Sequence, residues 1–129
     1  MTLAAYGAVA ELAESAALEL LLQEEIFCEV VILSQLSPFC LEPLLDSVER
    51  TGRLVVCEEG TRTAGWGAEV VAEVASEAFP LLRAAPQRVA ARDLPLASSK
   101  TLEDASLPQV ADIVAAAQGI AATHSYPRT

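Results

Sequence analysis

The segment Arg53–Val70, RLVVCEEGTRTAGWGAEV, decides how the rest of the chain is interpreted. Its apolar run at residues 54–57 is typical of a buried strand that is covered on both faces. Gly60, Gly65 and Gly67 follow in a turn, and from Gly67 onward apolar residues recur at helical spacing. The segment therefore predicts a strand, a glycine-rich turn and a helix, the junction at which α/β proteins place their functional sites.

Strand and helix patterns alternate along the whole chain. The expected strands are Thr2–Tyr6, Phe27–Leu33, Arg53–Cys57 and Gln87–Ala91, and the expected helices are Ala8–Leu22, Glu42–Glu49, Gly67–Phe79 and Pro108–Gln118. Such alternation is typical of a parallel sheet with helices on both faces and right-handed crossovers. We expect a three-layer α/β/α fold whose sheet is mainly parallel, with about four strands in the order 2-1-3-4.

Several boundaries carry local signals. Gly52 follows the second helix as a C-cap glycine. Ser106 and Gln109 have the capping-box spacing for the start of the last helix, and Gly119 marks its expected end. The stretch 94–107 contains prolines and serines without a period, so we expect an ordered surface loop there. We place one domain at residues 1–119 and a mobile tail at residues 120–129.

Charge and composition exclude several classes of protein. The chain has 129 residues, which fit one domain, and its 18 acidic and 8 basic residues give a formal charge of −10. That charge repels the phosphates of nucleic acids. The apolar runs are far shorter than the ~20 residues that cross a bilayer, and no basic leader follows Met1. We expect a cytoplasmic protein that binds neither nucleic acid nor membrane.

Groups that could carry chemistry are scarce. The cysteines Cys28, Cys40 and Cys57 lack C-x-x-C spacing, and the single histidine, His124, lies in the expected tail. The glycine spacing G-x-x-x-x-G-x-G fits neither a dinucleotide loop nor a nucleotide-triphosphate loop. We therefore predict no catalytic residue, no cofactor-binding residue and no metal site in this chain.

Several segments in combination resemble a known family. They are the glycine loop together with Leu3–Gly7, Cys28–Val31, Ser37–Pro38, Ser47–Arg53, Arg88–Ala90, Asp93–Pro95 and Leu102–Ile113. In order and spacing they resemble the C-terminal domain of transketolase-type, thiamine-diphosphate-dependent enzymes. Within that family the chain is most similar to the beta subunit of the decarboxylating component of the 2-oxoacid (pyruvate or branched-chain) dehydrogenases. The resemblance runs from residue 3 to about residue 118.

The resemblance implies a part of an enzyme that is inert alone. In the family, thiamine diphosphate and Mg²⁺ are held by a G-D-G motif in another domain, and this chain contains no G-D-G. It implies a structural and assembly domain that contributes a dimer interface and a wall of the substrate funnel. The implied partners are the pyrimidine- and pyrophosphate-binding domains or subunits in an oligomer, with the acyltransferase core as a further candidate.

The strand–turn–helix junction supplies the candidate site residues. A helix N-terminus at residues 64–67 would offer free N–H groups and a positive dipole end to a carboxylate or phosphate, with Arg62 adding a bidentate contact. The anion or substrate-funnel candidates are Glu59, Gly60, Arg62, Gly65 and Gly67. The interface candidates are Trp66, Phe27 and Phe39. Alternatively, the glycines only permit close packing of helix on sheet.

Two further expectations concern charged residues and function. Glu58 and Glu59 follow one another in a strand, so they should point to opposite faces and not form an acid–base pair. Arg53 and Arg88 begin strands at the far end of the sheet, where we expect them to be solvated. The alternative function is a free-standing interaction module, catalytically degenerate, that binds a partner protein or a small anion.

Overall fold

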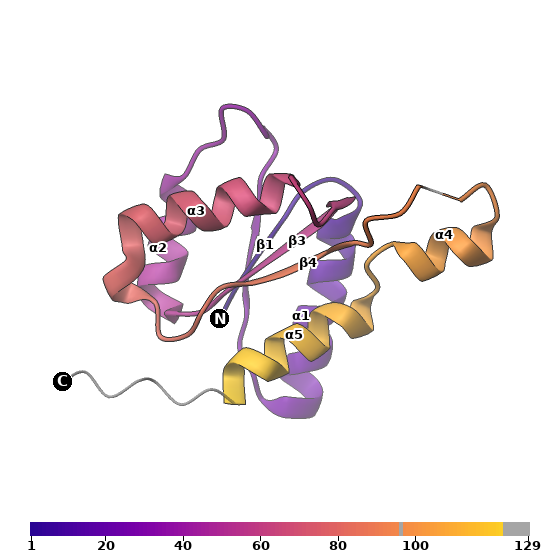
Figure 1. The fold of residues 1–129 in the computed structure, drawn as a ribbon. Helices are drawn as coiled ribbons and strands as arrows, with labels where there is room; N and C mark the ends of the chain where they lie inside the picture. Colours follow the sequence, from indigo (N-terminus) through magenta and orange to yellow (C-terminus); the bar gives the residue numbers. More distant parts are fainter. Residues whose placement is uncertain (96, 123–129) are drawn as a thin grey trace.

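In a computed structural model, which describes residues 1–95 and 97–122, the chain forms a parallel sheet with helices on both faces (Figure 1). The strands are β1 (Thr2–Ala5), β2 (Glu29–Ile32), β3 (Leu54–Thr61) and β4 (Gln87–Ala91). They lie in the order β2-β1-β3-β4, and every neighbouring pair is parallel. The expected α/β fold and the strand order 2-1-3-4 are confirmed.

The register leaves one strand longer than its neighbours at the carboxyl end of the sheet. Ala5, the last residue of β1, pairs with Ile32 of β2 and Cys57 of β3. β3 continues for four more residues to Thr61, and its pairing with β4 shifts register between Cys57 and Thr61. The end of β3 therefore extends beyond β1.

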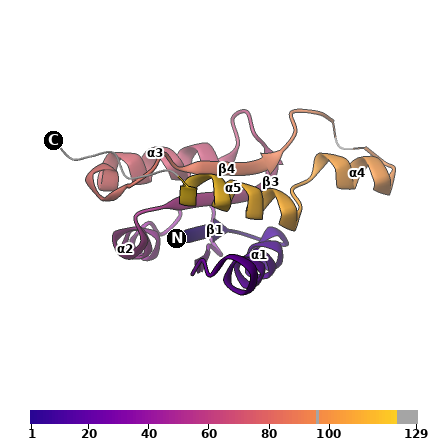
Figure 2. The same ribbon diagram turned by 90° about the horizontal axis from the view of Figure 1, so that it is seen from below.

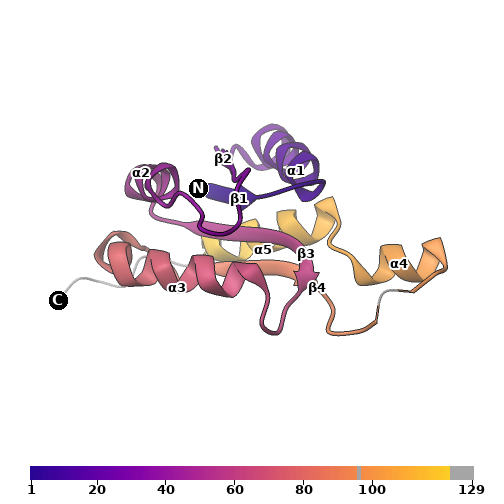
Figure 3. The ribbon, with the colours of Figure 1, turned by 90° about the horizontal axis from the view of Figure 1, so that it is seen from above.

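Two apolar layers sandwich the sheet. The helices are α1 (Val9–Glu24), α2 (Glu42–Thr51), α3 (Trp66–Ala78), η1 (Phe79–Leu81), α4 (Lys100–Ser106) and α5 (Val110–Ala122). Val55 and Cys57 of β3 pack with α1 and α5, whereas Leu54 and Val56 pack with α2 and α3, and all four are fully buried. Burial on both faces explains why the sequence of β3 contains an unbroken apolar run. Figures 2 and 3 show that α4 lies beyond the sheet, apart from both layers.

One expected boundary is confirmed and two are wrong. Gly52 ends α2 with a left-handed φ of 70°, and its N–H donates to the Val48 carbonyl at 2.7 Å. The region expected to be a loop at 94–107 instead contains α4, which is too short for its periodicity to be visible in the sequence. The last helix continues past Gly119 to Ala122, because Ile120 is buried against the core.

The capping box expected for the last helix is also wrong. Ser106 is the last residue of α4, and its hydroxyl donates to the Leu102 carbonyl at 2.8 Å. The carboxylate of Asp112 instead accepts the N–H of Gln109 at 2.8 Å, so an acid inside the helix caps its start. Residues 123–129 of the expected mobile tail lie outside the described residues. In the part that is described, no helix combines the length and apolar character that a membrane span requires.

Candidate functional site at the carboxyl end of the sheet

Glu58, near the end of β3, is a fully buried carboxylate with two fixed partners. Its Oε1 accepts from Nη2 of Arg88 at 2.5 Å, and its Oε2 accepts from the backbone N–H of Gly67 at 2.9 Å. The Arg88 side chain is only 14% exposed. A buried carboxylate is tolerated when a cation and a helix N-terminus both stabilise its charge, and here both do.

This arrangement corrects two expectations. Arg88 is not solvated, because it forms the buried ion pair with Glu58. The start of α3 does not offer all its N–H groups to an external anion, because Glu58 already accepts from Gly67. The sequence missed the pair because it depends on the pairing of β3 with β4, which places residues 30 positions apart on one face. Arg53 also has a partner, since its Nε donates to the Ile120 carbonyl at 3.0 Å.

The loop glycines are required by space around Glu58. A Cβ at Gly67 would lie 2.5 Å from Glu58 Oε1, whereas a Cβ at Gly65 would collide first with the backbone carbonyl of Thr61 and would also lie 2.8 Å from Glu58 Oε2. Real Cβ atoms essentially never approach so closely. At Gly60 the nearest atom would be 3.6 Å away, an ordinary contact. Close packing therefore explains Gly65 and Gly67, as the alternative interpretation held, and leaves Gly60 without a steric requirement.

Hydrogen bonds hold the loop between β3 and α3 in place from the β4 side. Nη1 of Arg62 donates to the Arg88 carbonyl at 2.9 Å, and Nη2 of Arg88 donates to the Arg62 carbonyl at 2.8 Å. Thr63 donates its N–H and its hydroxyl to the Asp93 carboxylate, at 2.8 and 2.6 Å. These bonds from Thr63 lower the pKa of Asp93 below its ordinary value. The loop is thus fixed in one conformation before anything binds to it.

Glu59 points away from Glu58, as expected for successive strand residues. It is exposed and lies beside Gly7, where an added Cβ would be 3.2 Å from Glu59 Oε1. Gly7 has a left-handed φ of 57° at the turn from β1 into α1. Burial raises the pKa of the neighbouring Tyr6 hydroxyl. Two acids that point to opposite faces do not form a catalytic pair.

The interface candidates fall at opposite ends of the sheet. Trp66 makes edge-to-face contacts with Tyr6 and Phe39, with ring centroids 4.9 and 5.9 Å apart, and its indole N–H donates to the Leu36 carbonyl at 3.1 Å. It therefore anchors the loop after β2 to the start of α3. Phe27 precedes β2 at the amino end and is 76% exposed. The structure brings Trp66 and Phe39 together and leaves Phe27 separate.

The donor groups at this end do not fit a metal or a diphosphate. Among the residues that the structure describes, no group of three or more His, Cys, Asp or Glu side chains is placed to hold a metal ion. Both oxygens of Glu58 are already occupied by Arg88 and Gly67. Burial raises the pKa of Cys57 to about 12, so its thiol stays protonated and is a poor nucleophile. The chemistry of the site is that of a rigid, charge-balanced support.

A parallel sheet of this order, covered by helices on both faces and carrying a strand–turn–helix junction at its carboxyl end, defines a three-layer α/β domain. Residues 1–113 match the family described as the C-terminal domain of transketolase. The chain belongs to this family. Two thirds of the α5 helix lies beyond the matched residues.

Relatives and a solved structure are similar over nearly the whole chain. Pyruvate dehydrogenase E1 component subunit beta from Rickettsia bellii is 37% identical over 120 residues, which are 93% of this chain and 37% of that protein. Acetoin:2,6-dichlorophenolindophenol oxidoreductase subunit beta from Cupriavidus necator is 38% identical over 92% of this chain and 35% of that protein. A structure described as a split-gene transketolase, inactive beta4 tetramer, superposes with a TM-score of 0.74 at 32% identity. It matches 92% of this chain and 37% of that one, so the chain spans little more than a third of each.

Proposed function

We propose that this chain is the structural and assembly C-terminal domain or subunit of a thiamine-diphosphate-dependent 2-oxoacid dehydrogenase or transketolase-like enzyme. In this role it contributes a dimer interface and a wall of the substrate funnel, and it is inert alone. The observation that carries the proposal is its membership of the transketolase C-terminal family, together with a match that covers 37% of the Rickettsia bellii subunit. The catalytic parts of such an enzyme lie in the portion that this chain does not match.

The geometry of the carboxyl end supports this role. The loop that follows β3 is fixed from below by Glu58 and from the side by Asp93, so its outer face is preorganised. Glu59, at the end of β3, and Arg62, in the loop, are exposed and would line a funnel wall together with Gly60 and Gly65. Gly67 is buried against Glu58 and would support this wall from below. A surface that is rigid before binding loses little conformational entropy when another domain docks on it.

Cofactor and partners belong to the assembled enzyme in this proposal. Thiamine diphosphate and Mg²⁺ would be held by the pyrimidine- and pyrophosphate-binding domains, since the described residues of this chain include no cluster of side chains that could hold the metal ion. Those domains are the proposed partners in a cytoplasmic oligomer, and the acyltransferase core of a dehydrogenase complex is a further one. No catalytic step is assigned to a residue of this chain.

An alternative is a free-standing interaction module that has lost its catalytic surroundings. It is favoured by the exposure of two large apolar side chains near the amino end, Leu22 at 73% and Phe27 at 76%. Exposed apolar surface of this kind is typical of a site that a partner covers. In the first proposal a partner docks at the carboxyl end of the sheet, whereas in the alternative it covers the apolar side chains near the amino end.

Calorimetric titration of the isolated chain with thiamine diphosphate and Mg²⁺ tests the assignment. We expect no saturable heat, because Glu58 is already paired with Arg88 and the described residues include no cluster of three metal-ligating side chains. Saturable binding with a micromolar dissociation constant would contradict the proposal. A parallel light-scattering series over protein concentration reports whether the chain self-associates while the cofactor is absent.

A further inference from the structure

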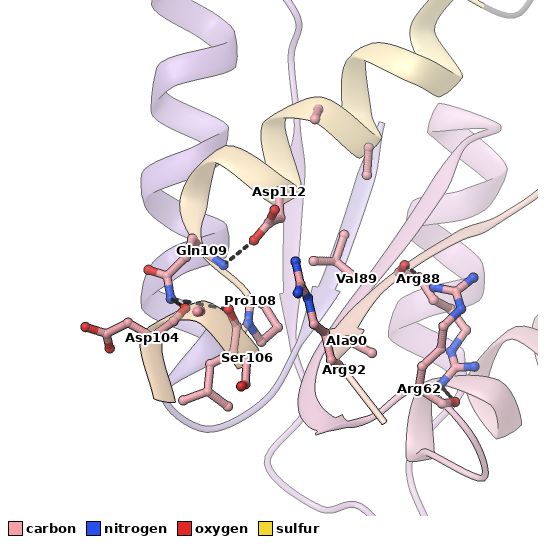
Figure 4. A pocket seen from close by; sticks show the side chains of 14 residues that line it. Arg62, Arg88, Val89, Ala90, Arg92, Asp104, Ser106, Pro108, Gln109 and Asp112 are labelled. Atoms are coloured by element: carbon pink, nitrogen blue, oxygen red, sulfur yellow. Dashed lines mark hydrogen bonds between the residues drawn. The ribbon is translucent and has the colours of Figure 1, made fainter. Parts of the chain in front are cut away.

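A pocket of about 490 Å³ lies between the end of β4, the end of α4 and the first turns of α5 (Figure 4). Its volume lies within the range of roughly 300–1,000 Å³ in which proteins hold small molecules. The pocket is separate from the buried Glu58 carboxylate and from the aromatic cluster around Trp66, neither of which lines it. Apart from Arg62, the residues that line it have no role in the proposed function.

Positive charge gathers at this pocket although the chain as a whole is strongly acidic. Three of the chain's 8 basic residues, Arg62, Arg88 and Arg92, line it. Arg88 is neutralised by Glu58, and Arg62 donates to a carbonyl. Within residues 1–95 and 97–122, neither an ion pair nor a hydrogen bond to another residue engages the Arg92 guanidinium. Among the described residues, Arg92 is therefore the arginine of this pocket whose guanidinium donors are all available to a ligand.

The acidic residues of the pocket already have partners. Asp104 is paired with Lys100 at 3.3 Å, and Asp112 accepts the N–H of Gln109 at 2.8 Å. Their residual negative charge on the rim disfavours a doubly charged ligand more than a singly charged one. A monoanion therefore suits the pocket better than a phosphate dianion.

The walls are small, apolar and held in place. Val89, Pro108 and Ala116 line the pocket, and the first two are buried. The N–H of Arg92 donates to the Ser106 carbonyl at 3.0 Å, which ties the start of its side chain to the end of α4. Figure 4 shows the Arg92 side chain extending into the space between Val89 and Asp112. A cation beside an apolar wall matches a ligand with a charged head and a compact apolar body.

We propose that this pocket binds a small organic monocarboxylate, with its carboxylate on the Arg92 guanidinium and its apolar body against Val89, Pro108 and Ala116. The guanidinium fork matches a carboxylate in two parallel hydrogen bonds. The site lies on this chain alone and shares only Arg62 with the assembly role proposed above, so either can fail without the other.

Titration of the ¹⁵N-labelled full chain with sodium butyrate at constant ionic strength tests the proposal by NMR. We expect saturable amide shifts that are confined to the pocket, at Ala90, Arg92, Ser106 and Asp112. Inorganic phosphate should bind more weakly, and butylamine should give no saturable shift. Phosphate binding tighter than butyrate would overturn the assignment to a carboxylate, and the absence of saturable pocket shifts with butyrate would overturn the site.

Three variants separate the site from general charge effects. Arg92→Gln should weaken butyrate binding by about tenfold, the loss expected for one charge-assisted bidentate contact. Ala115→Leu, at an exposed lining position, should block the pocket without disturbing the core. Arg83→Gln is the matched control, because it makes the same charge change at an exposed arginine outside the pocket. Equal weakening by Arg83→Gln and Arg92→Gln would mean nonspecific ion binding and would overturn the proposal.

Discussion

The two ends of the sheet each carry a glutamate–arginine pair, and the pairs differ in their surroundings. At the carboxyl end, Glu58 is fully buried against Arg88, at the start of α3. At the amino end, Glu29 pairs with Arg50 of α2 at 2.8 Å, and these side chains are 39% and 60% exposed. The same two residue types therefore form an enclosed support in one place and a solvated contact in the other.

The difference shows that burial, and not the presence of an ion pair, determines how much each pair contributes to stability. Glu29 also accepts from the Ser47 hydroxyl at 2.6 Å, and Ser47 is hydrogen-bonded to Thr2 at 2.7 Å. The Glu29 carboxylate is therefore stabilised by water and by a hydroxyl network in addition to Arg50. Glu58 depends on Arg88 and Gly67, because water does not reach it. Removing Arg88 would therefore leave a buried carboxylate without its cation, whereas removing Arg50 would leave Glu29 in contact with water.

The largest expected effect comes from Arg88→Ala. This change leaves the Glu58 carboxylate buried without its cation, so the free energy of unfolding should fall by about 3–5 kcal/mol. Urea denaturation followed by circular dichroism measures the loss. Arg50→Ala is the matched control at the exposed pair and should cost much less. Equal losses for the two variants would contradict the distinction between the two ends.

A smaller loss is expected at the glycine that packs against the buried pair. In Gly67→Val the new side chain would collide with the Glu58 carboxylate, since a Cβ alone would lie 2.5 Å from Oε1. We expect about 1–3 kcal/mol of destabilisation, typical of overpacking, and weaker assembly with partner domains. Differential scanning calorimetry measures it. Arg62→Ala removes an exposed contact and should leave the melting temperature nearly unchanged, so a silent Gly67→Val with an unfolding Arg62→Ala would refute the account of this loop.

Substitution of Gly119, which has open space around it, should raise the stability of the domain instead of lowering it. Gly119 lies inside α5, and an added Cβ there would meet nothing within 4 Å. Gly119→Ala should therefore raise the free energy of unfolding by roughly 0.5–1 kcal/mol through helix propensity. The same urea titration detects the gain. A loss of stability would mean that α5 does not continue through this position.

The smallest effect concerns the pH dependence at the amino end. Hydrogen bonds from Arg50 and Ser47 lower the pKa of Glu29 from 4.5 to about 2. Because the folded-state pKa is depressed, this contribution to stability is present above pH 4.5 and is lost as the pH falls toward 2. Glu29→Gln should flatten the stability curve slightly in that window, which urea midpoints at several pH values would reveal. An identical acid dependence in the two proteins would show that Arg50 does not hold Glu29.

The fold could be predicted from the sequence because its signals are local. Unbroken apolar runs, helical periodicity and Gly52 are each contained within one segment, and alternation of segments then limits the sheet to few arrangements. The same holds for Glu58 and Glu59, whose opposite orientation follows from strand geometry. Segment-level patterns were thus sufficient for the architecture.

The candidate site depends on contacts between distant segments, and there the sequence was insufficient. Arg88 and Glu58 meet only because β4 lies beside β3, and the occupied N–H of Gly67 follows from that pair. The pocket beside Arg92 requires the position of α4, a helix too short to leave a periodic pattern. The funnel wall stays a prediction for Glu59, Gly60, Arg62 and Gly65, whereas Gly67 is buried beneath it.

The central claim is that the carboxyl end of this domain docks on the rest of a longer enzyme. Replacing the matched 120-residue stretch of the Rickettsia bellii subunit with this chain tests it most directly, with sedimentation velocity as the measurement. We predict that the chimera assembles as the parent subunit does, that the charge reversal Glu59→Arg at the carboxyl end weakens assembly, and that Phe27→Ser at the amino end does not. A folded chimera that fails to assemble, or one disrupted by Phe27→Ser and indifferent to Glu59→Arg, would contradict the claim.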